Sequence, residues 1–347
     1  MNSLHDAARH VFASDNSSGV HPEVMAALLA VNGGHTDAYG ADPYTEAFGA
    51  WARALFGEGA VALPVLNGTG ANVLALQAAT PRFGAVLCAA SAHINTDEAA
   101  APERSAGLKL LPLPHEHGKV SPAAVHAAAG ALGSQHHAQP TTLSLSNVTE
   151  AGTAYTPAEI AALSAAVHEH GMLVHVDGSR LSHAAAFTGA GLRELVSEAG
   201  VDVLSLGATK NGAMLAEAVI ALHPAAAAAL PHLRKSTTQL VSKQRFVSAQ
   251  LLAMYEGDLW LRNAGHANAL AARLGSGLAA LPGVRLAHPV ESNAVFIEAP
   301  ATLLAPLRER FGFHGEGTAA SPARLMCSFD TREEHVDALL AAAAELA

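Results

Sequence analysis

The chain has few of the residues that would tie it to an extracellular or nucleic-acid-bound setting. It contains 2 cysteines in 347 residues. Cys88 and Cys327 are too few for a disulfide framework and do not have the spacing of a metal site. Its 20 Lys and Arg are outnumbered by 30 Asp and Glu, giving a net charge of −10, and no dense basic block occurs. A nucleic-acid partner is therefore not expected, because phosphate backbones attract concentrated positive charge.

Long apolar runs are also missing. The most apolar stretch, residues 218–233, is interrupted by His223, Pro224 and Pro231, so it cannot span a bilayer. The first residues, MNSLHDAARHVFASD, lack the apolar core of a signal peptide. We therefore expect a cytoplasmic protein that does not bind membranes.

Lysine is scarce, whereas histidine is abundant. The chain has five lysines against fifteen arginines, and a general bias toward arginine accounts for this without singling out any one lysine. Among the 20 histidines, His168 and His170 lie two apart on a predicted helix and so point in different directions. The other close pairs fall in loop-like segments. No metal site is predicted from this pattern.

Seven apolar runs of strand length recur along the first two thirds of the chain. They are Val61–Leu66, Val86–Ala89, Leu108–Leu113, Thr142–Ser146, Met172–Val176, Val201–Leu206 and Ala218–Leu222. Helical segments lie between most of them, and one has Pro157 in its first turn and Gly171 just beyond its end. Continuously apolar strands that alternate with helices predict a mainly parallel α/β sheet covered on both faces.

From about residue 246 the pattern changes. A long helical segment, Phe246–Leu281, is followed by three shorter strand-like pieces, VRLAHPV, NAVFIEA and LMCSFD. This predicts a smaller α+β C-terminal domain.

Ligands bind at the carboxyl ends of the strands in parallel sheets, so the residues just after each run are informative. Asn67-Gly68-Thr69-Gly70 follows the first run, with a helix expected near Ala71, and by itself it is an ordinary strand-to-helix turn. Asp177 ends another run, and either pairs with nearby Arg180 or serves a ligand. Lys210 ends a third, as a surface lysine or as a desolvated amine nucleophile.

Together these three sites are more specific than any one of them. A glycine-rich anion cradle, an aspartate and a lysine at successive strand ends are the groups that pyridoxal 5′-phosphate (PLP) requires. The cradle would hold the phosphate, the aspartate would keep the pyridine nitrogen protonated, and the lysine would bind the cofactor covalently.

Short motifs along nearly the whole chain resemble those of the PLP-dependent threonine aldolases, in the fold-type-I, β-eliminating lyase superfamily. The motifs are FASDNSSGVHPEV, DAYGADPYT, LNGTGAN, SAHINTDEAAA, HVDGSRL, GATKNGAM, LVSKQRF and SPARLMCSFD. The resemblance implies a mainly parallel seven-stranded sheet with helices on both faces. It also implies an N-terminal segment (1–30) that packs with the small domain, a large PLP-binding domain (31–245), a small C-terminal domain (246–347), and a homotetramer built from dimers.

The resemblance also implies roles on the cofactor side. Lys210 would hold PLP, Asp177 would pair with its ring nitrogen, and His93 would stack on its ring. The phosphate would be bound by three residues of the cradle and a threonine, namely Gly68, Thr69, Gly70 and Thr209.

On the substrate side, the resemblance implies that Ser14, Arg180 and Arg324 bind the carboxylate, with Arg180 also near the cofactor's phenolic oxygen. Tyr39 and the basic stretch 235–245 would contribute across a dimer interface. The expected reaction is retro-aldol cleavage of L-threonine or L-allo-threonine, with phenylserine as a further candidate, to glycine and an aldehyde.

One segment departs from the family pattern. A branch of the family has a second active-site histidine after the fourth strand, where this chain reads SNVTEAG, with Thr149 and Glu150 in that position. The base for the β-hydroxyl proton therefore stays open between His93, or a water that it orients, and Glu98. A β-eliminating PLP lyase acting on hydroxy- or aromatic amino acids is an alternative, as is a non-catalytic PLP-binding protein.

Overall fold

The computed structural model describes residues 4–347, which form a seven-stranded sheet and a three-stranded sheet. The strands of the large sheet are β1 Val61–Val65, β2 Gly84–Ala89, β3 Lys109–Leu113, β4 Gln139–Ser146, β5 Leu173–Gly178, β6 Val203–Gly207 and β7 Glu217–Ala221. Those of the small sheet are β8 Arg285–Leu286, β9 Ala294–Glu298 and β10 Ala323–Met326. Every strand predicted from an apolar run is present, with ends shifted by a few residues.

The large sheet has the order β1-β7-β6-β5-β4-β2-β3. The pairs β2–β3, β2–β4, β4–β5 and β5–β6 are parallel, whereas β7 is antiparallel to both of its neighbours. All residues of β2, β6 and β7 are buried, as expected for strands covered on both faces. The prediction of a mainly parallel α/β sheet is confirmed.

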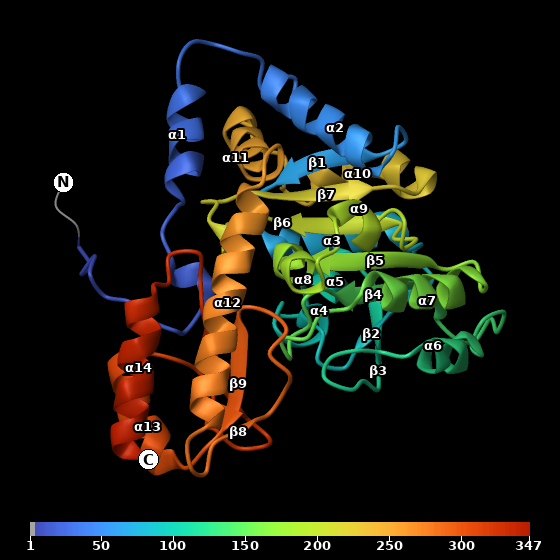
Figure 1. Ribbon diagram of the computed structural model, residues 1–347. Coiled ribbons are helices and arrows are strands. Elements are labelled where there is room, and N and C mark those ends of the chain that lie inside the picture. The colour runs from blue at the N-terminus through green and yellow to red at the C-terminus, as the bar shows by residue number, and fades with distance from the viewer. Residues whose placement is uncertain (1–3) are drawn as a thin grey trace.

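Helices cover both faces of the large sheet (Figure 1). The helices of the described chain, of which α13 and α14 pack with the small sheet instead, are α1 Pro22–Ala30, α2 Pro43–Phe56, α3 Gly68–Ala79, α4 His93–Thr96, α5 Ala101–Ser105, α6 Pro122–Ala129, α7 Pro157–His168, α8 Leu181–Thr188, α9 Leu192–Leu195, α10 Pro224–Ser236, α11 Arg245–Tyr255, α12 Leu259–Ala279, α13 Ala301–Phe311 and α14 Glu333–Leu346.

Alternate residues of one strand serve different cores. In β7, Val219 and Ala221 pack with α3 and α10, whereas Ala218 and Ile220 belong to the core on the opposite face. This follows from the period of two along a strand. The sheet is thereby held between two helical layers, and its carboxyl edge is left for other contacts.

The segment from Phe246 to Leu281, predicted as one helical stretch, is divided. α11 ends at Tyr255 and α12 begins at Leu259. Gly257 lies in the break, and glycine is a poor residue for a helix interior. α12 then contacts both α8 and the small sheet, and lies between the two parts of the molecule in Figure 1.

The small sheet has the order β10-β9-β8 and is antiparallel throughout. Its core contains residues from α12, α13 and α14 together with Phe12 from the N-terminal segment. The Phe12 carbonyl accepts a hydrogen bond from the Met326 backbone N–H at 2.8 Å. The domain limits at 30 and 245 stay predictions, and residues 1–3 of the predicted N-terminal segment lie outside the described residues.

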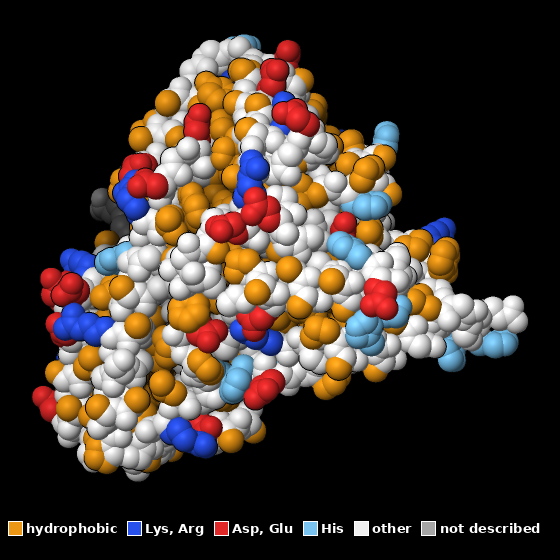
Figure 2. All heavy atoms as spheres, turned by 45° about the vertical axis from the view of Figure 1, so that its right-hand side comes forward, with side chains coloured by type: hydrophobic (Ala, Val, Ile, Leu, Met, Phe, Trp, Pro, Cys, Tyr) orange, Lys and Arg blue, Asp and Glu red, His pale blue; other side chains and the backbone are white. Residues whose placement is uncertain are grey.

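The described surface carries charges of both signs. On the face in Figure 2, basic and acidic side chains are interspersed and form no continuous basic area. Within residues 4–347, no helix is both long and apolar enough to cross a membrane.

Candidate active site

The carboxyl ends of β5 and β6 lie side by side, with Asp177 in register with Ser205. A short 3-10 turn, Thr209–Asn211, follows β6 and carries Lys210. Because β1 and β6 are each antiparallel to β7, the end of β1 and the start of α3 lie at the same edge. Strand-end groups far apart in the chain therefore meet here, as in other parallel sheets.

Two adjoining cavities open at this edge, and Lys210, His93 and Asn16 line both. The larger, of about 380 Å³, also has Arg180 and Arg324 in its wall. The smaller, of about 260 Å³, is lined by the start of α3 and by Thr209 and Glu217. After the roles that the resemblance predicts for their lining residues, we call them the substrate-side cavity and the cofactor-side cavity.

Lys210 is a desolvated amine. Burial and the nearby Arg180 guanidinium lower the pKa of Lys210 from its ordinary value, because both disfavour the ammonium form. Among residues 4–347, no hydrogen-bond acceptor engages its Nζ. A neutral amine in such a position is a nucleophile.

Asp177 is held as a carboxylate. Its Oδ2 accepts a hydrogen bond from Asn72 Nδ2 at 2.8 Å, and its Oδ1 accepts one from the Ser179 N–H at 3.0 Å. Burial opposes ionisation, but the Lys210 charge and these hydrogen bonds outweigh it and lower the pKa of Asp177. The carboxylate can therefore stabilise a cation in front of it.

Arg180 pairs with Asp15, and not with Asp177 as the structural interpretation of that motif supposed. Its Nε and Nη2 donate to Asp15 Oδ2 and Oδ1 at 2.7 and 2.8 Å. Although burial of Asp15 opposes ionisation, the Arg180 guanidinium holds its pKa far below the usual range. Asp15 is the first residue of a second 3-10 turn, Asp15–Ser17, in the FASDN motif. Its role as the partner of Arg180 was not predicted from the sequence.

The other predicted carboxylate-binding groups also line the substrate-side cavity. Arg324 donates from Nη2 to the Ala13 carbonyl at 3.1 Å, and burial and Arg180 lower its pKa. Ser14 precedes the 3-10 turn, and its Oγ accepts a hydrogen bond from the Asn16 N–H at 3.1 Å. Two guanidiniums thus meet in one cavity, which suits an anionic ligand.

His93 is anchored by two carboxylates. Its Nδ1 lies 2.8 Å from Glu98 Oε1, and its backbone N–H donates to Glu150 Oε1 at 2.8 Å. The hydrogen bond with Glu98 raises the pKa of His93 despite partial burial. Asn72 also donates to Glu98, at 2.9 Å, so a single amide connects the supports of His93 and Asp177.

A family model described as "Beta-eliminating lyase" matches residues 12–301. This chain belongs to the beta-eliminating lyase family. It is 41% identical over 335 residues to a "Low specificity L-threonine aldolase" of Pseudomonas sp. (strain NCIMB 10558), covering 95% of this chain and 96% of the relative. It is 42% identical to a protein of the same name from Pseudomonas aeruginosa, covering 94% of each chain.

A solved structure of the threonine aldolase of Leishmania major also resembles this beta-eliminating lyase. The TM-score is 0.91 at 30% identity, with 97% of this chain and 99% of the other covered. The sequence-based assignment of the family is therefore confirmed.

The predicted phosphate cradle of the lyase is only partly as expected. Gly68, Thr69 and Thr209 line the cofactor-side cavity, but Gly70 does not. α3 begins at Gly68 and not near Ala71, because the Asn67 side chain caps it by accepting the Gly70 N–H at 2.7 Å. The Gly70 N–H is thus already used within the protein.

Gly70 instead makes room for Gln239. A Cβ at position 70 would collide with the Gln239 amide, whose Oε1 accepts a hydrogen bond from the Leu66 N–H at 3.1 Å. The role of Gln239 was not predicted, because it lies more than 160 residues from the motif that it supports.

Tyr39 lies outside both cavities of this lyase chain. It is 54% exposed, and Lys235 Nζ lies 5.3 Å from its ring centroid. The predicted contribution of Tyr39 and residues 235–245 across a dimer interface stays a prediction. Within residues 4–347, no cluster of three or more His, Cys, Asp or Glu side chains is arranged to hold a metal ion.

Proposed function

We propose that this lyase binds PLP and cleaves β-hydroxy-α-amino acids, namely L-threonine, L-allo-threonine and phenylserine, to glycine and an aldehyde. One observation carries the proposal: the Lys210 amine, the Asp177 carboxylate and two cavity-lining arginines meet at one sheet edge. The names of the Pseudomonas and Leishmania relatives support the same reaction.

The residues present fit PLP. Lys210 offers a partly desolvated amine for its aldehyde, and Asp177 offers a carboxylate for its ring nitrogen. The N-terminus of α3 and the hydroxyls of Thr69 and Thr209 line the cofactor-side cavity, where free N–H groups suit a phosphate. His93 lines both cavities and would stack on the ring. When bound, PLP supplies the electron-accepting ring that bond cleavage at Cα requires.

The chain's own residues would then choose which bond breaks. Arg180, Arg324 and Ser14 would bind the substrate carboxylate and so set the rotation about the Cα–N bond. This orientation would decide which bond at Cα is weakened by the electron-accepting group. In an aldolase this is Cα–Cβ, so the two guanidiniums act as positioning groups for the cleavage.

A product analysis tests this proposal against the alternative of β-elimination. Purified enzyme with PLP should convert L-threonine, L-allo-threonine and phenylserine to glycine and the matching aldehyde. Ammonia and a keto acid as products would favour β-elimination instead. Binding of PLP without turnover of any of these amino acids would favour the non-catalytic alternative.

We further propose a cytoplasmic homotetramer, a dimer of dimers, with Tyr39 and residues 235–245 at a subunit boundary. The two cysteines are both buried and unpaired, which suits a reducing compartment. Sedimentation analysis of the wild type and a Tyr39→Ala variant tests the assembly. A monomeric wild type would contradict it.

A further inference from the structure

The segment between β4 and α7 brings a third carboxylate to the substrate-side cavity. Glu150 lines this cavity together with Lys210, Arg180 and His93. We infer that Glu150 is the catalytic residue that takes the proton of the substrate's β-hydroxyl. The inference rests on the proposed function and names a residue that the sequence had left without a role.

The two carboxyl oxygens of Glu150 have different surroundings. Oε1 accepts hydrogen bonds from the His93 N–H at 2.8 Å and from Ser146 Oγ at 2.6 Å. Oε2 is buried and, within residues 4–347, has no hydrogen-bond partner. A buried polar atom without a partner is costly. Because Oε2 is buried and does not face the cavity, the carboxyl group must turn toward the cavity to meet a substrate hydroxyl.

The charge environment keeps this carboxyl ready to accept a proton. Burial and the neighbouring Asp177 charge raise the pKa of Glu150, although hydrogen bonds from Ser146 and His93 oppose the shift. A base with a raised pKa is a better proton acceptor. The titratable groups that interact with Glu150 from the surrounding elements are Cys88, His93, Tyr155, Asp177 and Arg180.

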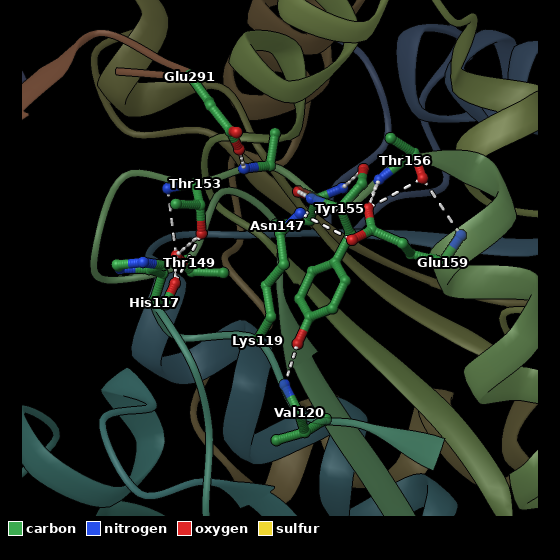
Figure 3. A network of polar contacts seen from close by, with 11 residues as sticks. His117, Lys119, Val120, Asn147, Thr149, Thr153, Tyr155, Thr156, Glu159 and Glu291 are labelled. Carbon is green, nitrogen blue, oxygen red and sulfur yellow. Dashed lines mark hydrogen bonds and ion pairs between the residues drawn. The ribbon is translucent and has the colours of Figure 1, made fainter. Parts of the chain in front are cut away.

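The loop that carries Glu150 is braced on both sides (Figure 3). Asn147 Oδ1 accepts from the Tyr155 N–H at 3.0 Å, closing the loop on itself. Thr149 and Thr153 donate to the His117 carbonyl at 3.1 and 2.7 Å.

Two further contacts fix the loop's end. The Tyr155 hydroxyl accepts a hydrogen bond from the Val120 N–H at 2.7 Å, and Glu291, from the β8–β9 connection, accepts one from the Ala154 N–H at 2.9 Å. Glu150 therefore lies on a loop tied to both parts of the molecule, which fixes the backbone that carries its carboxyl group.

The proton balance is complete. The β-hydroxyl O–H bond breaks and its proton moves to Glu150 Oε2, while the O–H electron pair forms the aldehyde C=O. The Cα–Cβ bond breaks and its electron pair stays at Cα, where bound PLP would supply the electron-accepting ring. Cα takes up one proton, either from Glu150 or from solvent, and in the second case Glu150 loses its own proton to solvent. Glycine is then released.

His93 and Glu98 are less suited to this step. The Nδ1 atom of His93 is held by Glu98 Oε1 at 2.8 Å, and its ring is the group expected to stack on the cofactor. Glu98 Oε1 is occupied by His93 and Asn72, and Glu98 lines only the cofactor-side cavity. Glu98 thus positions the His93 ring, and Glu150 is the remaining group for the β-hydroxyl.

Glu150→Gln tests the inference, because the amide oxygen can still accept the His93 and Ser146 hydrogen bonds. Acetaldehyde release from L-threonine should fall at least about 100-fold, within the range for loss of a general base. Exchange of the glycine α-hydrogen in deuterium oxide, followed by NMR, uses Lys210 and PLP but no hydroxyl. It should stay within about threefold of the wild type.

Glu159→Gln is the matched control, because Glu159 caps α7 in the same region but does not line the substrate-side cavity. It should leave both reactions unchanged. Cleavage at the wild-type rate in Glu150→Gln, or an equal loss of cleavage and exchange, would overturn the inference. A wild type that exchanges glycine but cleaves no β-hydroxy amino acid would overturn the proposed function and this inference with it.

The apoprotein gives an independent measure of the ionisation. A carboxyl whose folded-state pKa is raised stabilises the fold only at low pH, and this contribution is lost as pH rises through the folded pKa. The melting temperature of Glu150→Gln minus that of the wild type should therefore rise between pH 4 and pH 8. A difference independent of pH would contradict a buried, proton-accepting Glu150.

Discussion

The two cavities that meet at Lys210 are built differently. The cofactor-side cavity is formed mainly by consecutive strand ends and the N-terminus of α3. The substrate-side cavity takes residues from the N-terminal segment, the β4–α7 loop and the small sheet. The first presents backbone N–H groups and hydroxyls, and the second two guanidiniums and the side of the Glu150 residue. These differences agree with the proposed roles, a phosphate in the first cavity and a charged substrate in the second.

Lys210 belongs to both cavities, so its loss should have the largest effect. Lys210→Ala removes the amine and should abolish the visible absorbance of bound PLP and lower turnover by at least about 10³-fold. Lys109→Ala, at an exposed position of β3, is the control and should leave both unchanged. A Lys210→Ala enzyme that stays yellow and active would overturn the assignment of the whole site.

Asp15→Asn should damage the substrate side alone. It leaves the Arg180 guanidinium without its buried partner, which costs about 3–5 kcal/mol of stability when a buried pair is broken. Urea unfolding of the apoprotein measures this, and the KM for L-threonine should rise because Arg180 is no longer oriented. Asp258→Asn, which breaks the exposed pair with Arg262, should cost less than about 0.5 kcal/mol. Equal costs for the two variants would contradict a distinct role for Asp15.

Glu217 gives the cofactor side its own pH dependence. Burial raises the pKa of Glu217 to about 7, although hydrogen bonds from Thr209 and the Lys210 charge oppose the shift. Ionising the Glu217 carboxyl therefore lowers the free energy of unfolding. The stability that the protonated carboxyl contributes at low pH is lost as the pH rises through about 7. The free energy of unfolding of Glu217→Gln, relative to that of the wild type, should rise by on the order of 3 kcal/mol between pH 4 and pH 8.

Urea unfolding of the Glu217→Gln and wild-type apoproteins at the two pH values checks this gain. Glu309→Gln, at an exposed position of α13, is the control for the substitution itself. A Glu217→Gln variant with the same pH dependence as the wild type would show that the carboxyl is not desolvated.

The smallest effect concerns Gly70 and Gln239. An alanine at position 70 should displace the Gln239 side chain and break its hydrogen bond to Leu66, worth about 1 kcal/mol. In a Gln239→Ala background that cost should vanish, so a double-mutant cycle by urea unfolding should give a coupling of about 1 kcal/mol. Additive effects would mean that the position of the Gln239 side chain does not depend on the absence of a Cβ at position 70.

The amino-acid sequence by itself determined the strands, their mainly parallel order and the positions of Lys210 and Asp177. These are local properties: an apolar run of strand length is buried on both faces, and the residue that follows it reaches the ligand edge. The division of the segment after Phe246 was missed because Gly257 only weakens a helix, and a single weak residue does not decide a boundary.

Only the tertiary structure decided which charges meet. Arg180 turns to Asp15 and not to nearby Asp177, because the N-terminal segment folds back against the sheet edge. Gln239 occupies the space at Gly70, Asn72 joins two carboxylates, and Glu150 keeps one oxygen unpartnered. Each of these depends on contacts between segments distant in the chain, and burial then sets the energy of every charge. Local pattern can place a residue at the site, but its partner and protonation state depend on what the fold packs around it.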